Sequence, residues 1–518
     1  MKTTMKTCLL AAALGHLTTA MAEDAKGWFD AGRQTIARHQ AAQTTAAGKA
    51  KRIILFVGDG MGISTVTAAR ILEGQLRGEP GEENFLAFEK LPYTALAKTY
   101  NTNQQTPDSA GTMTAMMTGV KTKAGVISVD QSVVRGDCAS SQGKALTTLL
   151  EYAEMAGYAT GIVTTARITH ATPAATYAHV PERNWEDDHD LTEEAKQNGC
   201  KDIARQLIEF PYGDGIDVAL GGGRRSFLPR TQPDPENPEK TGERDDGRDL
   251  TAEWISRYPN AAYVWNKEQF DAIDTEKVTH LLGLFNRSHM EYEYDRPDDV
   301  GGEPSLSEMT EKAIRILDKN PNGFFLMVEA GRIDHAHHAG NAFRALTDTI
   351  ELAKAVETAR KLTDPGDTLI IVTADHSHVF TIAGYPTRGN PILGKVIGND
   401  SAGNPKNEPT LAKDGKPYTT LSYANGRGFA FLETGGDTHY DVDPVAGREG
   451  HDLSTIDTTD EGFHQEALVP LAAETHAAED VAIYAEGPGA YLLHGVLEQN
   501  VIFHAMWTAA VGEPPQAK

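Results

Sequence analysis

Acidic and histidine residues are concentrated at the ends of three apolar runs in this sequence of 518 residues. Each run is short and rich in aliphatic residues, as buried strands are, and the polar residues lie at its end or just beyond. Carboxylates and imidazoles are side chains that commonly bind zinc. Several of them at successive strand ends predict a centre for more than one metal ion. The three groups are Asp59; Glu329 with Asp334, His335, His337 and His338; and Asp375 with His376 and His378.

The second group has the clearest spacing for a metal site. Asp334 and His338 are four residues apart, so on a helix they project from one face and could hold one ion. Much further along the chain, Glu474 and His476 add a carboxylate and an imidazole before another apolar run. Asp59 alone is weaker evidence, because its Gly-Asp-Gly setting is also typical of an ordinary turn.

Ser109 is a candidate nucleophile. It follows Asp108 at the start of a segment with a helical pattern, where the positive end of a helix favours anions. A serine hydroxyl is a poor nucleophile at neutral pH, but bound zinc can stabilise its alkoxide. A serine at this position could instead only cap the helix. Arg183 has a planar guanidinium that suits two phosphate oxygens, although an ordinary surface arginine has the same signature.

The elements that would position these groups alternate between strands and helices. Short apolar runs separated by longer amphipathic stretches predict an α/β fold, with a mainly parallel central sheet and helices on both faces. The chemistry of such sheets lies at the carboxyl ends of the strands. The predicted strands are 52–57, 161–165, 216–220, 324–329, 368–373 and 481–485, and the predicted helices are 63–76, 146–155, 192–210, 306–317 and 343–362.

Two segments interrupt this alternation. Residues 229–249 are rich in Pro, Asp, Glu and Gly, which predicts a surface loop. Residues 385–475 contain many Gly, Pro, Asp and Asn with only short strand candidates, such as 428–432, and predict an inserted subdomain. The expected organisation is a signal peptide at 1–22, an N-terminal arm at 23–50, a catalytic α/β domain made of 51–384 and 476–518, and the inserted subdomain at 385–475.

The composition argues against several classes of protein. With 40% hydrophobic and 23% charged residues, the chain has the usual globular mix and is not expected to be disordered or fibrous. It has no run of 18 apolar residues and so no predicted membrane span. Its 48 basic and 73 acidic residues give a net charge of −25, which would repel nucleic-acid phosphates. The acidic excess fits either an adaptation to salt or an ordinary acidic exported protein.

The N-terminus predicts export to the periplasm or the medium. Residues 1–22 combine a basic start, an apolar centre and a small-residue cleavage pattern, as signal peptides do. Removal of this segment leaves two cysteines, Cys138 and Cys200. An even pair in an exported protein favours a disulfide, which the chain-entropy model values at roughly 4 kcal/mol for this loop. Two buried free thiols are the alternative.

Five long motifs occur at well-separated places in the chain: VGDGMG, TPDSAGTMTAMMTG, VEAGRIDHAHH, TADHSHVF and ETHAAEDVAIYAEGP. Together and in this order they resemble the alkaline phosphatase family, in the branch that includes the animal enzymes. The resemblance extends from about residue 51 to residue 505. It implies a homodimeric α/β phosphomonoesterase with an inserted crown-like subdomain, two Zn²⁺ and one Mg²⁺ per subunit.

The resemblance also implies roles for individual residues. Ser109 would form a phosphoserine intermediate, and Arg183 would bind the phosphate. His170 and His335 stand where the enteric bacterial enzyme has Asp and Lys, and both are as in the animal branch. The implied ligands are Asp334, His338 and His476 for the first zinc; Asp59, Asp375 and His376 for the second zinc; and Asp59, Thr172 and Glu329 for magnesium.

The chain departs from the animal pattern in two places. Animal enzymes have a calcium-like fourth site. In this chain, Glu236, the Phe285 carbonyl and Glu303 could match its ligands. However, Asn286 stands where a glutamate is expected, which weakens this match. The sequence also lacks the hydrophobic C-terminal tail that a GPI anchor requires, so no membrane anchor is expected.

Three alternative functions agree less well with the sequence. A phosphodiesterase of the same superfamily usually has Thr where Ser109 stands. A sulfatase needs Cys-x-Pro-x-Arg or its Ser equivalent, whereas Cys138 and Cys200 lack that spacing and instead match the first disulfide of the animal branch. A metal or phosphate storage protein would not require a serine at a helix start. The physiological substrate is not indicated, because the motifs concern the phosphate and not its leaving group.

Overall fold

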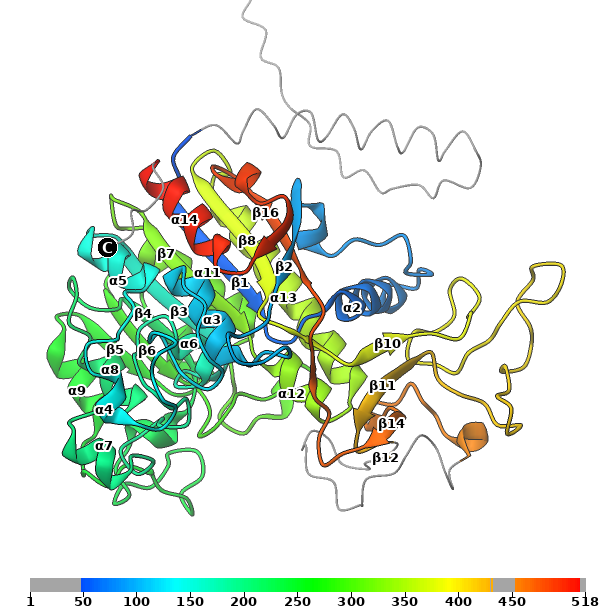
Figure 1. Ribbon diagram of the computed structural model, residues 1–518, viewed down its shortest axis with the longest axis horizontal. Helices are drawn as coiled ribbons and strands as arrows, with labels where there is room; N and C mark the ends of the chain where they lie inside the picture. Colours follow the sequence, from blue (N-terminus) through cyan, green and yellow to red (C-terminus); the bar gives the residue numbers. More distant parts are fainter. Residues whose placement is uncertain (1–47, 429, 432–451, 513–518) are drawn as a thin grey trace, which may run out of the picture. The chain divides into compact units, whose positions relative to one another are not determined.

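A ten-stranded sheet forms the centre of the residues that the computed structural model describes, which are 48–428, 430–431 and 452–512 (Figure 1). In spatial order its strands are β17 (Gly495–Glu498), β2 (Tyr93–Lys98), β16 (Val481–Glu486), β8 (Thr368–Ala374), β1 (Arg52–Gly58), β7 (Phe324–Ala330), β3 (Ala159–Arg167), β4 (Val218–Gly222), β6 (His280–Leu284) and β5 (Ala261–Val264). β16 is antiparallel to both of its neighbours. The other pairings are parallel, so the predicted fold class is confirmed. The predicted signal peptide at 1–22 and most of the predicted arm lie outside the described residues.

Three adjacent strands, β8, β1 and β7, are buried along almost their whole length. Strands covered on both faces bury both sets of side chains, which explains why their sequences are continuous apolar runs. The three strands are also paired without offset, because Gly58 at the end of β1 lies opposite Ala330 of β7 and Ala374 of β8. The segments that follow these strands therefore leave the sheet at one level.

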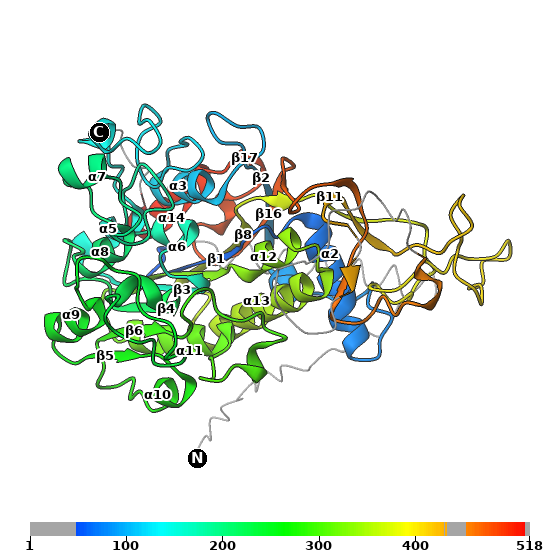
Figure 2. The ribbon, with the colours of Figure 1, turned by 90° about the horizontal axis from the view of Figure 1, so that it is seen from below.

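Helices cover both faces of the sheet (Figure 2). On one face, α11 (Leu306–Leu317) and α13 (Ala342–Leu362) contact the central strands and each other. On the other face lie α5 (Leu149–Met155), α6 (Ala171–Ala174) and α14 (Val501–Val511), against which α3 (Ser109–Thr118) packs. Among the residues that the structure describes, no helix has the length and apolar character needed to cross a membrane. The other helices are α2 (Ile63–Leu76), α4 (Cys138–Ser141), α7 (Glu193–Gln197), α8 (Ile203–Ile208), α9 (Leu250–Arg257), α10 (Lys267–Asp271) and α12 (Arg332–His338).

The predicted helix 192–210 is wrong. The structure has two short helices there, α7 and α8. Gly199 lies just beyond the first with φ +76°, a conformation that ends helices. The Asp202 carboxylate accepts a hydrogen bond from the Arg205 N–H and begins the second helix. The other predicted helices and the predicted strands of the central sheet are present, with bounds that differ by a few residues.

The segment 229–249 has neither helix nor strand, as predicted, but it is not only a surface loop. Its Asp234 is buried and accepts hydrogen bonds of 2.8 Å from Nε and Nη2 of the buried Arg224. Its Arg244 is also buried and donates to Asp202 at 3.0 Å. Paired charges therefore anchor this irregular segment in place of an apolar core.

Residues 385–475 contribute to two small sheets outside the central one. In the first, β11 (Leu421–Gly426) lies between β10 (Phe380–Ile382) and β14 (Ala467–Pro470), beside α2 in Figure 1. In the second, β12 (Ala430–Phe431) pairs with β13 (Phe463–His464). Within the predicted strand 428–432, the described residues include the two of β12, while residues 429 and 432 lie outside the described residues. β11 is not among the predicted strands. The described residues belong to one compact unit, and the division into a catalytic domain and an inserted subdomain stays a prediction.

The predicted disulfide is confirmed. Cys138 and Cys200 are bonded, with their Cα atoms 6.1 Å apart, so the alternative of two free thiols is wrong. The bond joins α4 to the segment between α7 and α8.

Removal of this disulfide should destabilise the fold. We expect the double variant Cys138→Ala with Cys200→Ala to lose up to about 4 kcal/mol in unfolding free energy, because the unfolded chain is no longer closed into a loop. Denaturant titrations with and without reductant would measure this. Reductant should destabilise the wild type and leave the double variant unchanged; an equal effect on both proteins would contradict the prediction.

Candidate metal centre

The three groups of acids and histidines predicted from the sequence meet at one edge of the central sheet. Asp59 follows β1, Asp375 follows β8, and Glu329 is the penultimate residue of β7. Because these strands end in register, their polar residues converge. Ligand atoms of Asp59, Asp375 and His376 all lie within 4.8 Å of one another, which is the spacing of a shared ion.

Several carboxylate oxygens in this cluster are buried without a hydrogen bond. Asp59, Glu329 and Asp375 have no exposed surface. Both oxygens of Asp59, Oε1 of Glu329 and Oδ2 of Asp375 accept no hydrogen bond. An unpaired carboxylate in a protein interior is costly, and buried acids are normally paired or bound to cations. The cluster therefore has the form of a cation site.

The mutual repulsion of these acids is large. Burial, followed by the charges of Asp375, Asp334 and Glu329, raises the pKa of Asp59 well above its usual range. Burial likewise raises the pKa of Glu329 to about 8, although the Thr164 hydroxyl that donates to it opposes the shift. Without cations, burial and mutual repulsion favour the protonated forms of these side chains, and bound cations would take the place of those protons.

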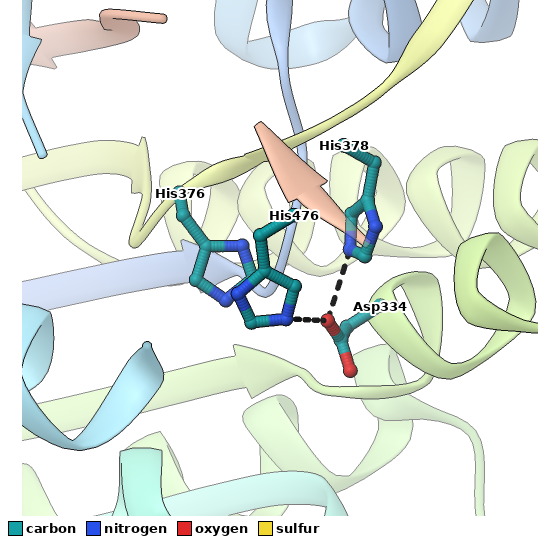
Figure 3. Close-up of side chains that lie close together, drawn as sticks. All are labelled: Asp334, His376, His378 and His476. Carbon is teal, nitrogen blue, oxygen red and sulfur yellow. Dashed lines mark hydrogen bonds and ion pairs between the residues drawn. The ribbon is translucent and has the colours of Figure 1, made fainter. Parts of the chain in front are cut away.

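A second cluster surrounds Asp334 on α12. Its Oδ1 lies 2.9 Å from Nε2 of His378, 3.2 Å from Nε2 of His476 and 3.3 Å from Nε2 of His338. Figure 3 shows the His378 and His476 rings directed at this oxygen, with His376 stacked on His476 at a centroid distance of 3.6 Å. Burial opposes ionisation of Asp334, but these histidines outweigh it and keep its pKa well below the usual range.

The histidine tautomers in this cluster are set by carbonyl groups. His338 Nδ1 lies 2.6 Å from the Glu474 carbonyl, and His476 Nδ1 lies 2.8 Å from the Pro107 carbonyl. A carbonyl can only accept, so each Nδ1 carries the proton and each Nε2 lone pair is free to bind a metal. The two Nε2 atoms are 3.1 Å apart and face one position.

His378 belongs to this cluster, although the sequence resemblance gives it no role. Its Nε2 contacts Asp334, and its Nδ1 lies 2.6 Å from the Glu474 carboxylate. The H-x-H spacing after β8 is the signal that marks it. His476 reaches the site because β15 (His476–Ala477) pairs with β9 (Ser377–His378).

Ser109 is the first residue of α3, and it does not cap the helix. The cap is Asp108, whose Oδ1 accepts a hydrogen bond of 3.0 Å from the Gly111 N–H. The helix-cap alternative for Ser109 is therefore wrong. Its side chain is buried, with Oγ 3.2 Å from Nε2 of His376. The hydroxyl thus lies beside the metal-ligand cluster and at the positive end of α3.

Arg183 is held in the site by two partners. Its Nη1 donates to Asp108 Oδ2 at 3.2 Å, and its Nη2 lies 3.1 Å from His170 Nε2. Burial and the charges of Arg183 and Arg167 lower the pKa of His170 well below its usual range, so this imidazole is neutral and can accept from the guanidinium. The alternative of an ordinary surface arginine does not fit this arrangement.

A third group of potential ligands is formed by Asp59, His170 and Glu329, whose ligand atoms lie within 4.8 Å of one another. The Thr172 hydroxyl, on α6, is buried and has no hydrogen-bond partner. All three residues implied for magnesium thus have a buried oxygen without a hydrogen bond, and His170 lies close enough to be a ligand as well.

His289 is a neighbour of the site that sequence reasoning misses. Its ring lies 4.1 Å from that of His335 and 5.3 Å from that of His170, and its Nδ1 accepts a hydrogen bond from the Arg167 N–H. It lies in an irregular segment after β6, where no apolar run or regular spacing marks it.

The residues implied for a fourth metal have protein partners. The Asn286 amide donates to Glu303 Oε1 at 3.0 Å, and Glu236 pairs with Arg224 at 2.7 Å. Phe285 follows β6 directly and is buried. Among the described residues, the clusters of acids and histidines with metal-ligand spacing include neither Glu236 nor Glu303.

A mainly parallel α/β sheet that gathers buried carboxylates, imidazoles, a serine and an arginine at the carboxyl ends of its strands defines a metal-dependent hydrolase. The family model of alkaline phosphatase matches residues 50–511, and the chain belongs to this family. It is accordingly a phosphomonoester hydrolase, and the resemblance seen in the sequence is confirmed.

Relatives and solved structures agree with this assignment. The chain is 45% identical to the tissue-nonspecific alkaline phosphatase of Gallus gallus, over 100% of this chain and 95% of the relative. It is also 45% identical to the human tissue-nonspecific isozyme, over 94% and 89%. The structure of Thermus thermophilus alkaline phosphatase has a TM-score of 0.61 and 25% identity, over 91% and 93%. The alkaline phosphatase of the Antarctic bacterium TAB5, at 22% identity, has the same fold with a TM-score of 0.58.

Gly60 brings two of the clusters together. It has φ +69°, and its N–H donates to Asp375 Oδ1 at 3.0 Å. A Cβ atom at this position would lie 2.3 Å from the His378 ring. Only glycine therefore allows the turn after β1 to lie against His378.

We expect Gly60→Ala to lower phosphatase activity and metal affinity by about 10- to 100-fold, because displacement of His378 disturbs Asp334. Gly143→Ala is the matched control, since Gly143 has φ +70° but has no atom within 4 Å of the added Cβ. In both variants the new alanine must adopt a left-handed backbone conformation, so the backbone strain is matched and only the contact with His378 differs. Activity assays and metal analysis would separate them, and equal activity in the two would contradict the role of Gly60.

Proposed function

We propose that this chain hydrolyses phosphate monoesters through a phosphoserine at Ser109, with two Zn²⁺ and one Mg²⁺ per subunit. The observation that carries the proposal is the position of Ser109 Oγ, 3.2 Å from His376 Nε2 at the edge of the metal centre. Asp108 already caps α3, so the helix does not need the Ser109 hydroxyl as a cap. The hydroxyl is therefore available for chemistry.

The residues present fit the three ions. The unpaired buried oxygens of Asp59, Asp375, Glu329 and Thr172 support this view, because such atoms normally have a partner. When bound, the ions would supply positive charge and Lewis acidity to the serine oxygen and to the leaving oxygen. The first zinc would be held by Asp334, His338 and His476, the second by Asp59, Asp375 and His376, and magnesium by Asp59, Glu329 and Thr172.

The chain's own groups would orient the reaction. The dipole of α3 favours the alkoxide form of Ser109 and the anionic phosphate at the same helix end. Arg183 uses one nitrogen for Asp108 and another for His170, and its remaining N–H groups can hold phosphate oxygens. The Ser109 oxygen would bond to phosphorus while the ester oxygen leaves, and hydrolysis of the phosphoserine would restore the serine.

His170 and His335 would act around this phosphate rather than on phosphorus. His170 orients Arg183 through a contact of 3.1 Å, and His335 lies 5.6 Å from His170, ring to ring. The serine distinguishes this site from that of a phosphodiesterase with threonine at the same place. A storage protein would need neither Ser109 nor an arginine fixed by two partners.

The assembly and the location follow from the family. We propose a homodimer that is exported to the periplasm or the medium, as the resemblance and the sequence of residues 1–22 imply. Light scattering of the purified enzyme would give the oligomeric state.

Ser109→Ala should lose about a thousandfold or more in phosphatase activity, because the serine oxygen is the proposed nucleophile. It should also no longer take up label from radioactive phosphate when the reaction is quenched with acid. Ser305→Ala is a suitable control, since Ser305 is another buried serine at a helix start and caps α11. Loss of that cap should cost about 1 kcal/mol of stability but leave activity and labelling intact. Labelled protein in Ser109→Ala would remove Ser109 from the mechanism.

Chelation should abolish activity, and zinc with magnesium should restore it. His338→Ala and Asp375→Ala should each lower the zinc content by about one ion per subunit. The neighbouring His337 provides the control, because its ring packs on His378 but both of its nitrogens are used by Thr65, at 2.9 Å, and Tyr423, at 2.8 Å, so neither can bind an ion. His337→Gln should keep its zinc. Elemental analysis would decide, and active protein without a transition metal would refute the ligand assignment.

A further inference from the structure

A separate group of potential metal ligands, outside the catalytic centre, lies at the opposite edge of the sheet. Asp214 and Asp217 precede β4, and His280 is the first residue of β6. These are the amino ends of parallel strands, whereas the catalytic centre lies at the carboxyl ends. The family motifs do not include these residues, and the proposed catalytic reaction does not use them.

The geometry of this group suits one ion. Ligand atoms of Asp214, Asp217 and His280 lie within 4.8 Å of one another. Asp217 is positioned by the Thr160 N–H, which donates to its Oδ2 at 2.8 Å. The His280 ring is stacked on Tyr258, with centroids 4.1 Å apart and planes 2° from parallel. Two of the ligands are therefore fixed, and the exposed Asp214 leaves a path from solvent.

An unpaired buried carboxylate adds independent support. Glu154, on α5, is only 2% exposed, and its Oε2 accepts no hydrogen bond. This oxygen faces the Asp214 segment, because a Cβ atom added to Gly213 would lie 2.1 Å from it. Burial and the charges of Asp217 and Asp214 raise the pKa of Glu154 to about 9. A buried acid with an oxygen that accepts no hydrogen bond, close enough to two other acids to feel their charges, increases the need for positive charge at this place.

The protein itself supplies little positive charge to this group. Lys319 acts on Asp217 through its charge, but its Nζ donates to the Val278 carbonyl at 2.6 Å and also to the Thr275 carbonyl. Burial lowers the pKa of His280, so this imidazole is neutral and has a lone pair to offer. Its Nε2 lies 3.2 Å from the Asp214 carbonyl and donates to it in the absence of a metal ion. The Thr279 hydroxyl donates to the Pro259 carbonyl and lies 3.1 Å from His280 Nδ1, so it can accept the ring proton when Nε2 binds an ion.

We propose that Asp214, Asp217 and His280, with Glu154 behind them, bind one divalent transition-metal ion outside the catalytic centre. The mixture of carboxylate oxygen and imidazole nitrogen favours Zn²⁺ or Co²⁺, since Mg²⁺ and Ca²⁺ prefer oxygen ligands alone. The ion would join the start of β4, the start of β6 and the end of α5, so it would stabilise this edge of the sheet.

Metal content of variants tests the proposal. Asp214→Asn removes an exposed ligand and should not impair folding, while Asp274→Asn changes an acid near the same edge that pairs with Lys277. Enzyme with a zinc- and magnesium-loaded catalytic centre would be dialysed against Zn²⁺ at a fixed free concentration. We expect Asp214→Asn to hold about one ion per subunit less than the wild type and Asp274→Asn to equal it, with phosphatase activity unchanged in all three. Equal zinc content in the wild type and Asp214→Asn would overturn the proposal and show adventitious binding only.

Quenching of tryptophan fluorescence by Co²⁺ would locate the proposed ion. The Trp254 ring lies 6.2 Å from that of His280, so Co²⁺ bound there should quench the Trp254 emission. The zinc-loaded wild type should lose a component of its emission on addition of Co²⁺, and that loss should be absent in Trp254→Phe and in Asp214→Asn. Quenching that is the same in all three proteins would place the ion elsewhere and contradict the proposal. Because the catalytic zinc ions stay bound throughout, failure of this test leaves the proposed function untouched.

Discussion

The burial of acidic side chains at the carboxyl edge of the sheet is the constraint on which the rest of the structure depends. Asp59, Glu329 and Asp375 have no exposed surface, and Asp334 is 5% exposed. Unpaired charges in such a place would be unfavourable. With the proposed cations bound among them, these acids would be neutralised, so the stability of this edge and its chemistry would have the same origin. A global charge of −25 does not prevent phosphate binding if bound cations dominate the local field.

The positions of the proposed ligands follow from ordinary elements of the fold. Buried strands with matched register deliver Asp59 and Asp375 to one level, and a helix turn brings His338 beside Asp334. His476 arrives from far along the chain, through its pairing with His378. The long segment between those histidines passes through the small sheets and returns at Glu474, whose carboxylate and carbonyl orient two of the imidazoles. A segment outside the central sheet therefore helps to shape the metal centre.

Much of the site could be predicted because the residue types and spacings that suit metal binding occur close together in the sequence. Apolar runs that end in acids identified β1, β7 and β8, and the four-residue spacing of Asp334 and His338 identified α12 as a ligand helix. The break between α7 and α8 could not be predicted in this way, because the helical pattern continues across Gly199, whereas the left-handed φ of Gly199 ends one helix and the Asp202 cap begins the next. His289 carries no local signal and gains its place from tertiary packing. Arg244 is likewise buried and paired with Asp202, although it lies in a segment whose composition suggests only a loop.

The measurement that tests the central claim most directly is the anomalous scattering of a crystal of the active enzyme on both sides of the zinc absorption edge. The claim is that cations, and not protons, occupy the space between the buried acids. The account predicts one zinc peak among Asp334, His338 and His476 and a second among Asp59, Asp375 and His376, with weaker scattering near Thr172. An active crystal with no anomalous peak at either group of ligands would contradict it.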